Sequence, residues 1–206
     1  YSKRSKPNKF GSKYFDIYTY DLISEEEKRL TFNSRLTSPI YISEKDRIVS
    51  ITTYDGTSNI VWSFRDSIDF KPITKYNNGV QIFSLDYDPS TNSIWFDATD
   101  HHTRDLYSIN LDSLEVKYIK ENFDLRDPSF NSSNYVYSSD KTGIYNIYYY
   151  EQDSSIPITN VKGGAFMPDI STSGRILYSC YDNGQFNISI LEDITPLSLN
   201  RIYNEK

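Results

Sequence analysis

A short element recurs five times along the chain: Asp or Asn, then Ile or Leu, then usually a strand-forming residue. Successive copies begin 43, 46, 41 and 41 residues apart, so the period is nearly constant. A repeat constrains the fold more than any single motif does, because every copy must form the same structural unit. The copies are Asp16-Ile17-Tyr18, Asn59-Ile60-Val61, Asp105-Leu106-Tyr107, Asn146-Ile147-Tyr148 and Asn187-Ile188-Ser189.

The surroundings of each copy also repeat. A segment that often begins with Pro, an apolar segment and a polar turn come before it, and a polar connection with a brief strand follows. The third repeat departs, with VKYIK at 116–120 where the other copies carry RLT, PIT or PLS. One unit is therefore four short strands in about 43 residues.

Four antiparallel strands at this period predict the blade of a β-propeller. A helical repeat would show apolar spacing near 3.6, whereas these segments alternate or stay apolar for only a few residues. A single blade cannot bury both of its faces, so neighbouring blades stack on each other. We therefore predict an all-β fold, a propeller of four-stranded antiparallel blades.

The repeats also predict the domain organisation. We expect one partial propeller domain over residues 1–206. The first copy is recognisable only in the second half of its blade, so about 4.5–5 blades are expected. The blade units lie near 1–31, 32–75, 76–120, 121–160 and 161–200.

Over nearly the whole chain the repeats resemble those of the TolB-like β-propellers, which are Tol-type relatives of WD40 repeats. The chain matches their Leu-Thr element, leading Pro, turn Gly and Ile-Tyr element. The Ser-Pro-Asp-Gly element is degraded, and only Gly174 preserves its hairpin glycine. The remaining matches are Leu30-Thr31, Ile73-Thr74, Ile158-Thr159, Pro39, Pro128, Pro168, Gly56, Gly143 and Gly184.

The resemblance implies a non-catalytic scaffold that binds a protein or peptide through its blade loops. TolB-like propellers are typically six-bladed, so the chain is expected to be part of a larger propeller or of a multidomain envelope protein. The implied location is periplasmic or outer-membrane-associated. Two alternatives stay open: an accessory propeller of a peptidase whose catalytic domain lies outside this chain, and a propeller that binds a small molecule or sugar.

Composition narrows the classes of partner. The net charge is −6 and basic residues are scattered, which argues against nucleic acid. No apolar run reaches the length of a membrane span, so direct membrane insertion of this segment is not expected. The segment also contains no signal-peptide pattern. The basic stretch 2–9 and the acidic stretch 24–29 are expected in solvated connections, and the lone Cys180 as a small apolar strand residue.

Residues 86–97 loosely imitate a calcium-binding loop. Asp86, Asp88, Ser90 and Asn92 alternate, and Asp97 stands twelfth. The central Gly and terminal Glu of such a loop are missing, so we favour an Asp-Pro-Ser turn between strands.

The histidines form a second metal candidate. His101 and His102 are adjacent, with Asp100 and Asp105 nearby. Adjacent strand residues point to opposite faces, so we favour an exposed turn over a metal site.

Catalytic signatures are absent from the sequence. It contains no nucleophile elbow, zinc-protease motif or phosphate-binding loop. We therefore predict no catalytic, cofactor-binding or metal-ligating residue, no cofactor, and no enzyme activity of this segment; the activity of the parent protein stays open.

A tyrosine-rich strand follows the turn of the fourth repeat. We expect Tyr148 and Tyr150 on one face, and Ile147 and Tyr149 on the other. Together with Tyr145, these rings either pack between blades or form an aromatic platform for a ligand.

Overall fold

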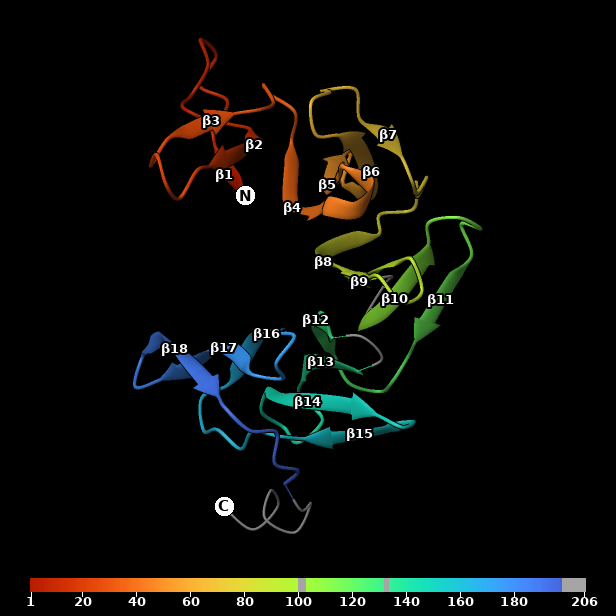
Figure 1. The fold of residues 1–206 in the computed structure, drawn as a ribbon, viewed down its shortest axis with the longest axis vertical. Helices are drawn as coiled ribbons and strands as arrows, with labels where there is room; N and C mark the ends of the chain where they lie inside the picture. Colours follow the sequence, from red (N-terminus) through yellow and green to blue (C-terminus); the bar gives the residue numbers. More distant parts are fainter. Residues whose placement is uncertain (100–102, 132–133, 198–206) are drawn as a thin grey trace. The chain divides into compact units, whose positions relative to one another are not determined.

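The computed structural model describes residues 1–99, 103–131 and 134–197. In these residues the chain forms five antiparallel sheets and one short 3-10 helix, Ser43–Lys45 (Figure 1). In every sheet the strands follow one another in chain order. Each sheet is thus a propeller blade, and the predicted all-β propeller fold is confirmed.

The first and last sheets have three strands and the other sheets have four. The first contains β1 (Ser2–Arg4), β2 (Phe15–Tyr20) and β3 (Glu27–Arg29). The second contains β4 (Leu36–Ile42), β5 (Arg47–Tyr54), β6 (Thr57–Phe64) and β7 (Lys71–Pro72). The third contains β8 (Gln81–Asp88), β9 (Ser93–Thr99), β10 (Arg104–Asn110) and β11 (Val116–Ile119). The fourth contains β12 (Leu125–Asn131), β13 (Asn134–Ser139), β14 (Asn146–Glu151) and β15 (Ser154–Pro157). The fifth contains β16 (Ala165–Ile170), β17 (Ile176–Asp182) and β18 (Gln185–Leu191).

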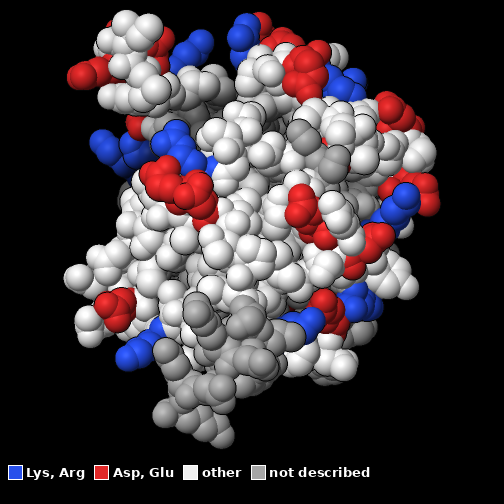
Figure 2. All heavy atoms as spheres, turned by 60° about the horizontal axis from the view of Figure 1, so that its bottom comes forward, with Lys and Arg blue, Asp and Glu red and all other residues white. Residues whose placement is uncertain are grey.

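Two compact units divide the chain, Tyr1–Leu85 and Asp86–Lys206. The boundary falls within β8. Each unit is described below by itself. On the face drawn in Figure 2, Lys and Arg side chains are interspersed with Asp and Glu side chains.

Two predictions for the first blade were wrong in part. The acidic stretch 24–29 was expected in a solvated connection, but its residues 27–29 form β3 and pair with β2. The basic stretch 2–9 was expected in a solvated connection, but its residues 2–4 form β1 and pair with β2. Lys3 makes an ion pair of 2.8 Å with Glu27 on β3. The charges misled the prediction because long basic side chains can stay in water while their backbone completes a sheet.

The leading Pro of the repeat marks a β-bulge in the first strand of three blades. The residue before each Pro has positive φ, and the strand register shifts there. Pro has no N–H to give to a ladder, so a bulge is where a strand tolerates it. The residues before Pro are Ser38 (φ 48°), Asp127 (φ 52°) and Met167 (φ 51°).

A second recurring feature explains the Asp/Asn-Ile element and the Thr that follows the fourth strand. In the fourth blade, Thr159 Oγ1 accepts a hydrogen bond from Ile147 N (2.8 Å) and donates one to Asn146 Oδ1 (3.0 Å). Val161 N donates to the same Oδ1 (3.1 Å). We call this arrangement the Asx–Thr clasp, because it fastens the start of the third strand to the chain beyond the fourth.

The second blade contains the same clasp. Thr74 Oγ1 accepts from Ile60 N (2.8 Å) and donates to Asn59 Oδ1 (2.9 Å), which also accepts from Tyr76 N (2.7 Å). The side chains of both clasp residues are satisfied in a buried setting, where an unpaired group would be costly.

The first blade uses Asp in place of Asn. Thr31 Oγ1 accepts from Ile17 N (2.9 Å), and Asp16 accepts from Ser34 N (2.9 Å). Arg29 pairs with the second oxygen of Asp16 at 2.6 Å. The pKa of Asp16 is lowered: burial opposes this, but the hydrogen bonds from Ser34 and Arg29 outweigh it.

The third blade lacks the clasp. Ile119 pairs with Leu106, so Lys120 stands where the other blades have Thr. Asp105 is 3% exposed, and its Oδ1 has no hydrogen-bond partner in the described part of the chain. Burial raises the pKa of this carboxyl, and the charge of Lys120 opposes the rise. The departure seen in the sequence therefore leaves one buried oxygen of Asp105 without a hydrogen-bond partner among the described residues.

The tyrosine-rich strand β14 packs as predicted. Tyr148 lies in a core cluster with Leu106 and Tyr137, and Tyr150 packs against it. The opposite face, with Ile147 and Tyr149, belongs to a cluster shared with β16 and β17. Within the fourth blade, the ring of Tyr148 also stacks on that of Tyr137 from β13, with centroids 5.7 Å apart. The rings are thus packing between blades, which was one of the two predicted roles.

Removing one clasp hydroxyl should destabilise the unit that contains it. In Thr159→Val the buried Ile147 N–H loses its acceptor, and we expect a loss of about 2 kcal/mol in unfolding free energy. Urea unfolding followed by tryptophan fluorescence measures it. The control Thr19→Val, on an exposed position, should change stability by less than about 0.5 kcal/mol. Equal effects of both substitutions would contradict a role for the clasp.

Adding the missing hydroxyl should stabilise the third blade. Lys120→Thr places a donor beside Asp105, and we expect a gain of about 1 kcal/mol in unfolding free energy. The matched control is Lys117→Thr on β11. Lys117 is exposed, and it pairs with Ser108 and not with Asp105. The idea fails if Lys120→Thr is no more stabilising than its control in the same urea titration.

Candidate functional site

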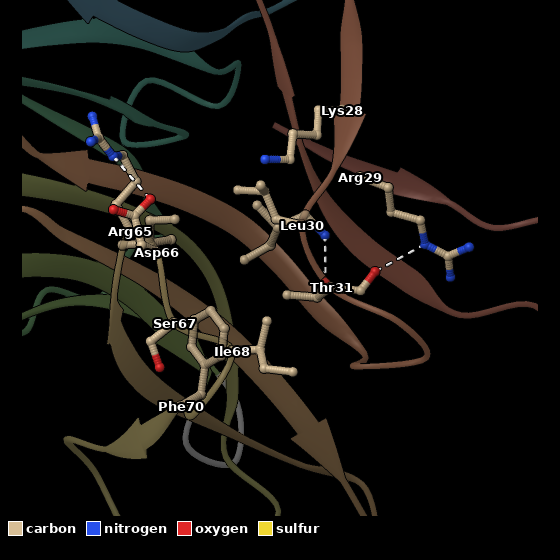
Figure 3. A pocket seen from close by; sticks show the side chains of 11 residues that line it. Lys28, Arg29, Leu30, Thr31, Arg65, Asp66, Ser67, Ile68 and Phe70 are labelled. Carbon is tan, nitrogen blue, oxygen red and sulfur yellow. Dashed lines mark hydrogen bonds and ion pairs between the residues drawn. The ribbon is translucent and has the colours of Figure 1, made fainter.

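A pocket of about 360 Å³ lies in the unit Tyr1–Leu85, between the first and second blades. Its walls are β3 with the two residues that follow, and the segment 65–70 between β6 and β7 (Figure 3). The outer strands of these two blades are short, since β3 has three residues and β7 has two.

The segment 65–70 is held by local hydrogen bonds. Ser67 N donates to Phe64 O (3.0 Å), and Ser63 Oγ donates to Ser67 O (3.0 Å). Ser67 Oγ in turn accepts from Asp69 N (3.1 Å). This wall of the pocket is therefore a built turn with its own hydrogen bonds.

Apolar side chains lie at the base of the pocket, within a lining whose exposed surface is mostly polar. Ile17 and Ile48 belong to the core cluster of this unit, and Leu30 and Phe70 pack against that cluster. At the lip, Ile68 is 74% exposed. A hollow that combines apolar side chains with a few polar groups is a candidate binding site.

Three cationic side chains line the pocket, and they differ in whether a carboxylate lies nearby. Arg29 is bound to Asp16 and donates to Thr31 O (2.9 Å), and Figure 3 shows it pointing away from Leu30 and Ile68. Arg65 lies 3.6 Å from both Asp46 and Asp66. Each of these two charges therefore has an anionic neighbour.

Lys28 differs from both arginines. Figure 3 shows its side chain extending toward the space between Leu30 and Arg65. Among the described residues no carboxylate lies within ion-pair distance of Lys28. The pocket thus combines an apolar floor with an ammonium group that lacks an anionic partner.

The unit Asp86–Lys206 contains carboxylates of a different kind, which connect the first strands of its blades. Asp86 on β8 accepts from Phe130 N on β12 (2.7 Å), and Asp127 on β12 accepts from Met167 N on β16 (3.3 Å). Ser129 Oγ donates to Asp169 on β16 (3.3 Å). These groups hold neighbouring blades together.

Burial dominates the electrostatics of these carboxylates. It raises the pKa of Asp86, and the nearby charge of Asp169 adds to the rise. Burial likewise raises the pKa of Asp127, with the charge of Asp97 adding and that of Arg104 opposing. Arg104 pairs with Asp97 and lies 3.3 Å from Asp127. Asp97, Arg104 and Asp127 thus form a network of ion pairs that links β9, β10 and β12.

The residues that imitated a calcium loop do not converge. Asp88 accepts from Ser90 N (2.9 Å) and from Thr91 Oγ1 (2.6 Å), which holds the predicted turn. Asp97 pairs with Arg104. Asp86 instead binds the neighbouring strand, so the alternating carboxylates serve separate structural contacts.

The second metal candidate, at the histidines, lies mostly outside the described residues. Asp100, His101 and His102 lie outside the described residues. Within 1–99, 103–131 and 134–197, no group of three His, Cys, Asp or Glu side chains could hold a metal ion. Cys180 is a free cysteine of intermediate exposure in β17.

Sequence reasoning missed the pocket residues. Lys28 was treated as part of a solvated acidic run, and Ile68 and Phe70 attracted no attention. The available signal was an isolated Ile in the charged stretch RDSIDF, at 65–70. It could not show which side chains of another blade lie opposite.

Comparison with known proteins identifies the family. Residues 12–143, more than half of the chain, match the family described as the dipeptidyl peptidase IV (DPP IV) N-terminal region. The chain belongs to this family. Among curated proteins, no sequence relative matches the chain.

Solved structures agree on the propeller fold. TolB from Acinetobacter baumannii is 19% identical with a TM-score of 0.73, over 90% of this chain and 50% of that chain. The chain therefore spans half the length of that TolB. The β-propeller domain of the Trilobed protease from Pyrococcus furiosus is 12% identical with a TM-score of 0.60, over 96% of this chain and 79% of that chain. The acylaminoacyl peptidase of Pyrococcus horikoshii is 8% identical with a TM-score of 0.58, over 96% of this chain and 44% of that chain.

These structures show the fold, which is that of TolB-like propellers. The same fold occurs in TolB and in peptidases, so it is shared by more than one function. In the described part of this family member, no helix has the length and apolar character needed to cross a membrane.

The raised pKa of Asp86 predicts a pH-dependent cost. Below about pH 4 the carboxyl is protonated in both the folded and the unfolded state, and no cost arises. As the pH rises through the folded pKa, the buried group must ionise and stability falls. Asp86→Asn escapes this cost, so its stability relative to the parent chain should increase from about pH 4 to about pH 7.

The measurement is urea unfolding across that pH range in a Trp62→Phe background, so that Trp95 reports on the unit of Asp86. The control is Asp193→Asn, an exposed carboxylate of the same unit. A stability difference between Asp86→Asn and its parent that does not vary with pH would refute the assignment.

Proposed function

We propose that the chain is a non-catalytic binding module that holds a protein or peptide through the loops of its blades. The observation that carries this proposal is the pocket between the first two blades. It has an apolar floor continuous with the core, a built turn as one wall and the exposed Ile68 at its lip. Such a hollow fits one large apolar side chain of a partner, the usual anchor of a peptide contact.

The charges support a protein or peptide partner and argue against nucleic acid. The net charge is −6, and both signs are interspersed on the face shown in Figure 2. A nucleic-acid groove needs a concentrated basic surface.

A second candidate function is favoured by the family match. The chain belongs to the dipeptidyl peptidase IV N-terminal region family, and the acylaminoacyl peptidase that it resembles is more than twice as long as the region covered. An accessory propeller of a peptidase would use the same pocket to hold peptides for a separate catalytic domain. A nucleophile elbow elsewhere in the parent protein would favour this candidate over the free-standing scaffold.

The proposed setting is periplasmic or outer-membrane-associated, with residues 1–206 as one partial propeller domain of a larger envelope protein. The support is the TolB-like fold. Detection of the parent protein by antibody in cell fractions tests this setting, and a purely cytoplasmic signal would overturn it.

Binding should depend on the lip of the pocket. Peptides selected from a displayed random library against the chain would be measured by fluorescence anisotropy. We expect Ile68→Asp to weaken their binding by about tenfold, which corresponds to loss of one apolar anchor.

The matched control is Ile23→Asp, because Ile23 is 97% exposed, lies in the same unit and does not line the pocket. It should bind like the parent chain. If library selection yields no peptide, or if both substitutions leave affinity unchanged, the pocket is not the binding site and the proposal fails.

A further inference from the structure

We propose that the pocket selects a peptide segment carrying a carboxylate next to a large apolar side chain, with Lys28 binding the carboxylate. This inference rests on the proposed function and names the class of peptide that the pocket takes. Its basis is the position of one cation without an anionic partner above an apolar floor.

The charge balance of the lining favours an anion. The lining contains three cationic residues, Lys28, Arg29 and Arg65, and one acidic residue, Asp66. Arg29 is neutralised by Asp16, whose carboxylate is fully buried. Lys28 is left with its charge available toward the pocket.

The same balance favours a monovalent carboxylate over a phosphate. Phosphate sites typically use the fork of an arginine, which makes two parallel hydrogen bonds. Here Arg29 is committed to Asp16, and Arg65 lies between Asp46 and Asp66. Lys28 offers one compact ammonium, and Asp66 at the rim would repel a second negative charge.

The apolar floor sets the other half of the specificity. Ile17 and Ile48 are buried at its base, and the apolar surface that a ligand can reach comes from the half-buried Leu30 and Phe70 and the exposed Ile68. A ligand that reaches both this floor and Lys28 must carry its apolar group and its carboxylate close together. A single residue that carries both groups, or two adjacent residues of a peptide, meets this condition.

Two sources supply that chemistry. A peptide that ends in an apolar residue carries the carboxylate on the same residue, and an internal segment carries it on a neighbouring Asp or Glu side chain. The recognition by Lys28 and the floor is the same in both, so the experiment contains one arm for each source.

The probes are four short synthetic peptides in two matched pairs. The first pair is acetyl-Gly-Ser-Gly-Phe as the free acid and as the amide. The second is acetyl-Gly-Ser-Glu-Phe-Gly-Ser-amide and its counterpart with Gln in place of Glu. Binding to the chain with labelled Ile and Leu methyl groups is followed by NMR, because Ile17, Ile48, Ile68 and Leu30 report from the pocket itself.

We expect at least one acidic peptide to shift these methyl signals and to bind about fivefold to tenfold more tightly than its neutral counterpart. The preferred pair shows whether the carboxylate comes from a chain end or from a side chain. Raising the salt concentration should weaken the acidic peptide more than the neutral one.

The protein variants test Lys28 directly. Lys28→Glu should abolish the preference for the acidic peptide, and Lys28→Gln should reduce it to near the neutral level. Lys28 is exposed, so the fold should tolerate both changes. The control is Lys13→Glu, which makes the same charge change in the same unit outside the pocket lining and should keep the preference.

The outcomes separate this inference from the proposed function. If acidic and neutral peptides shift the pocket methyl signals equally, and Lys28→Glu binds like the parent chain, carboxylate selection is overturned while apolar peptide binding stands. If library-selected peptides bind without any dependence on Ile68, the proposed function fails, and this inference fails with it.

Discussion

The Asx–Thr clasp is the interaction that the first, second and fourth blades share. It binds the start of the third strand to the chain beyond the fourth, through a Thr hydroxyl that both accepts and donates. A four-stranded blade would otherwise be held along its outer strand by a short ladder alone. The clasp also explains why two sequence elements some 13 residues apart, Asn146 and Thr159, recur together. Where Lys120 replaces the Thr, one buried oxygen of Asp105 has no hydrogen-bond partner among the residues that the structure describes.

Between blades, carboxylates accept hydrogen bonds and tyrosine rings make the apolar contacts. Asp86 and Asp127 accept backbone N–H groups from the first strand of the next blade. Tyr148 and Tyr149 bury their rings on opposite faces of one strand. The blades in the unit Asp86–Lys206 are therefore joined on their inner strands by hydrogen bonds, and across their faces by packing. In the unit Tyr1–Leu85, the pocket lies between β3 with the two residues that follow it and the segment 65–70.

Much of the fold could be predicted because the repeat carries it. The constant period predicted antiparallel blades, and the alternation around Ile147 predicted which tyrosines share a face. The stretch at 2–9 was misread, because its charges concealed a strand whose backbone pairs with β2. The turn after Asp88 was predicted from residue type, since short-range hydrogen bonds of Asp need no tertiary context.

The candidate site lay beyond such reasoning, because its parts belong to two blades. Lys28 and Ile68 are 40 positions apart, and neither shows a motif. The sequence by itself determined the repeating blade, its turns and the alternation of buried and exposed residues, since these follow from local geometry and period. Only the tertiary structure decided that β3 and the segment 65–70 lie on either side of a pocket, and that no carboxylate of the described residues lies within ion-pair distance of Lys28. Whether residues far apart in the chain form an ion pair or enclose a pocket depends on their positions in space, and the sequence pattern does not give these positions.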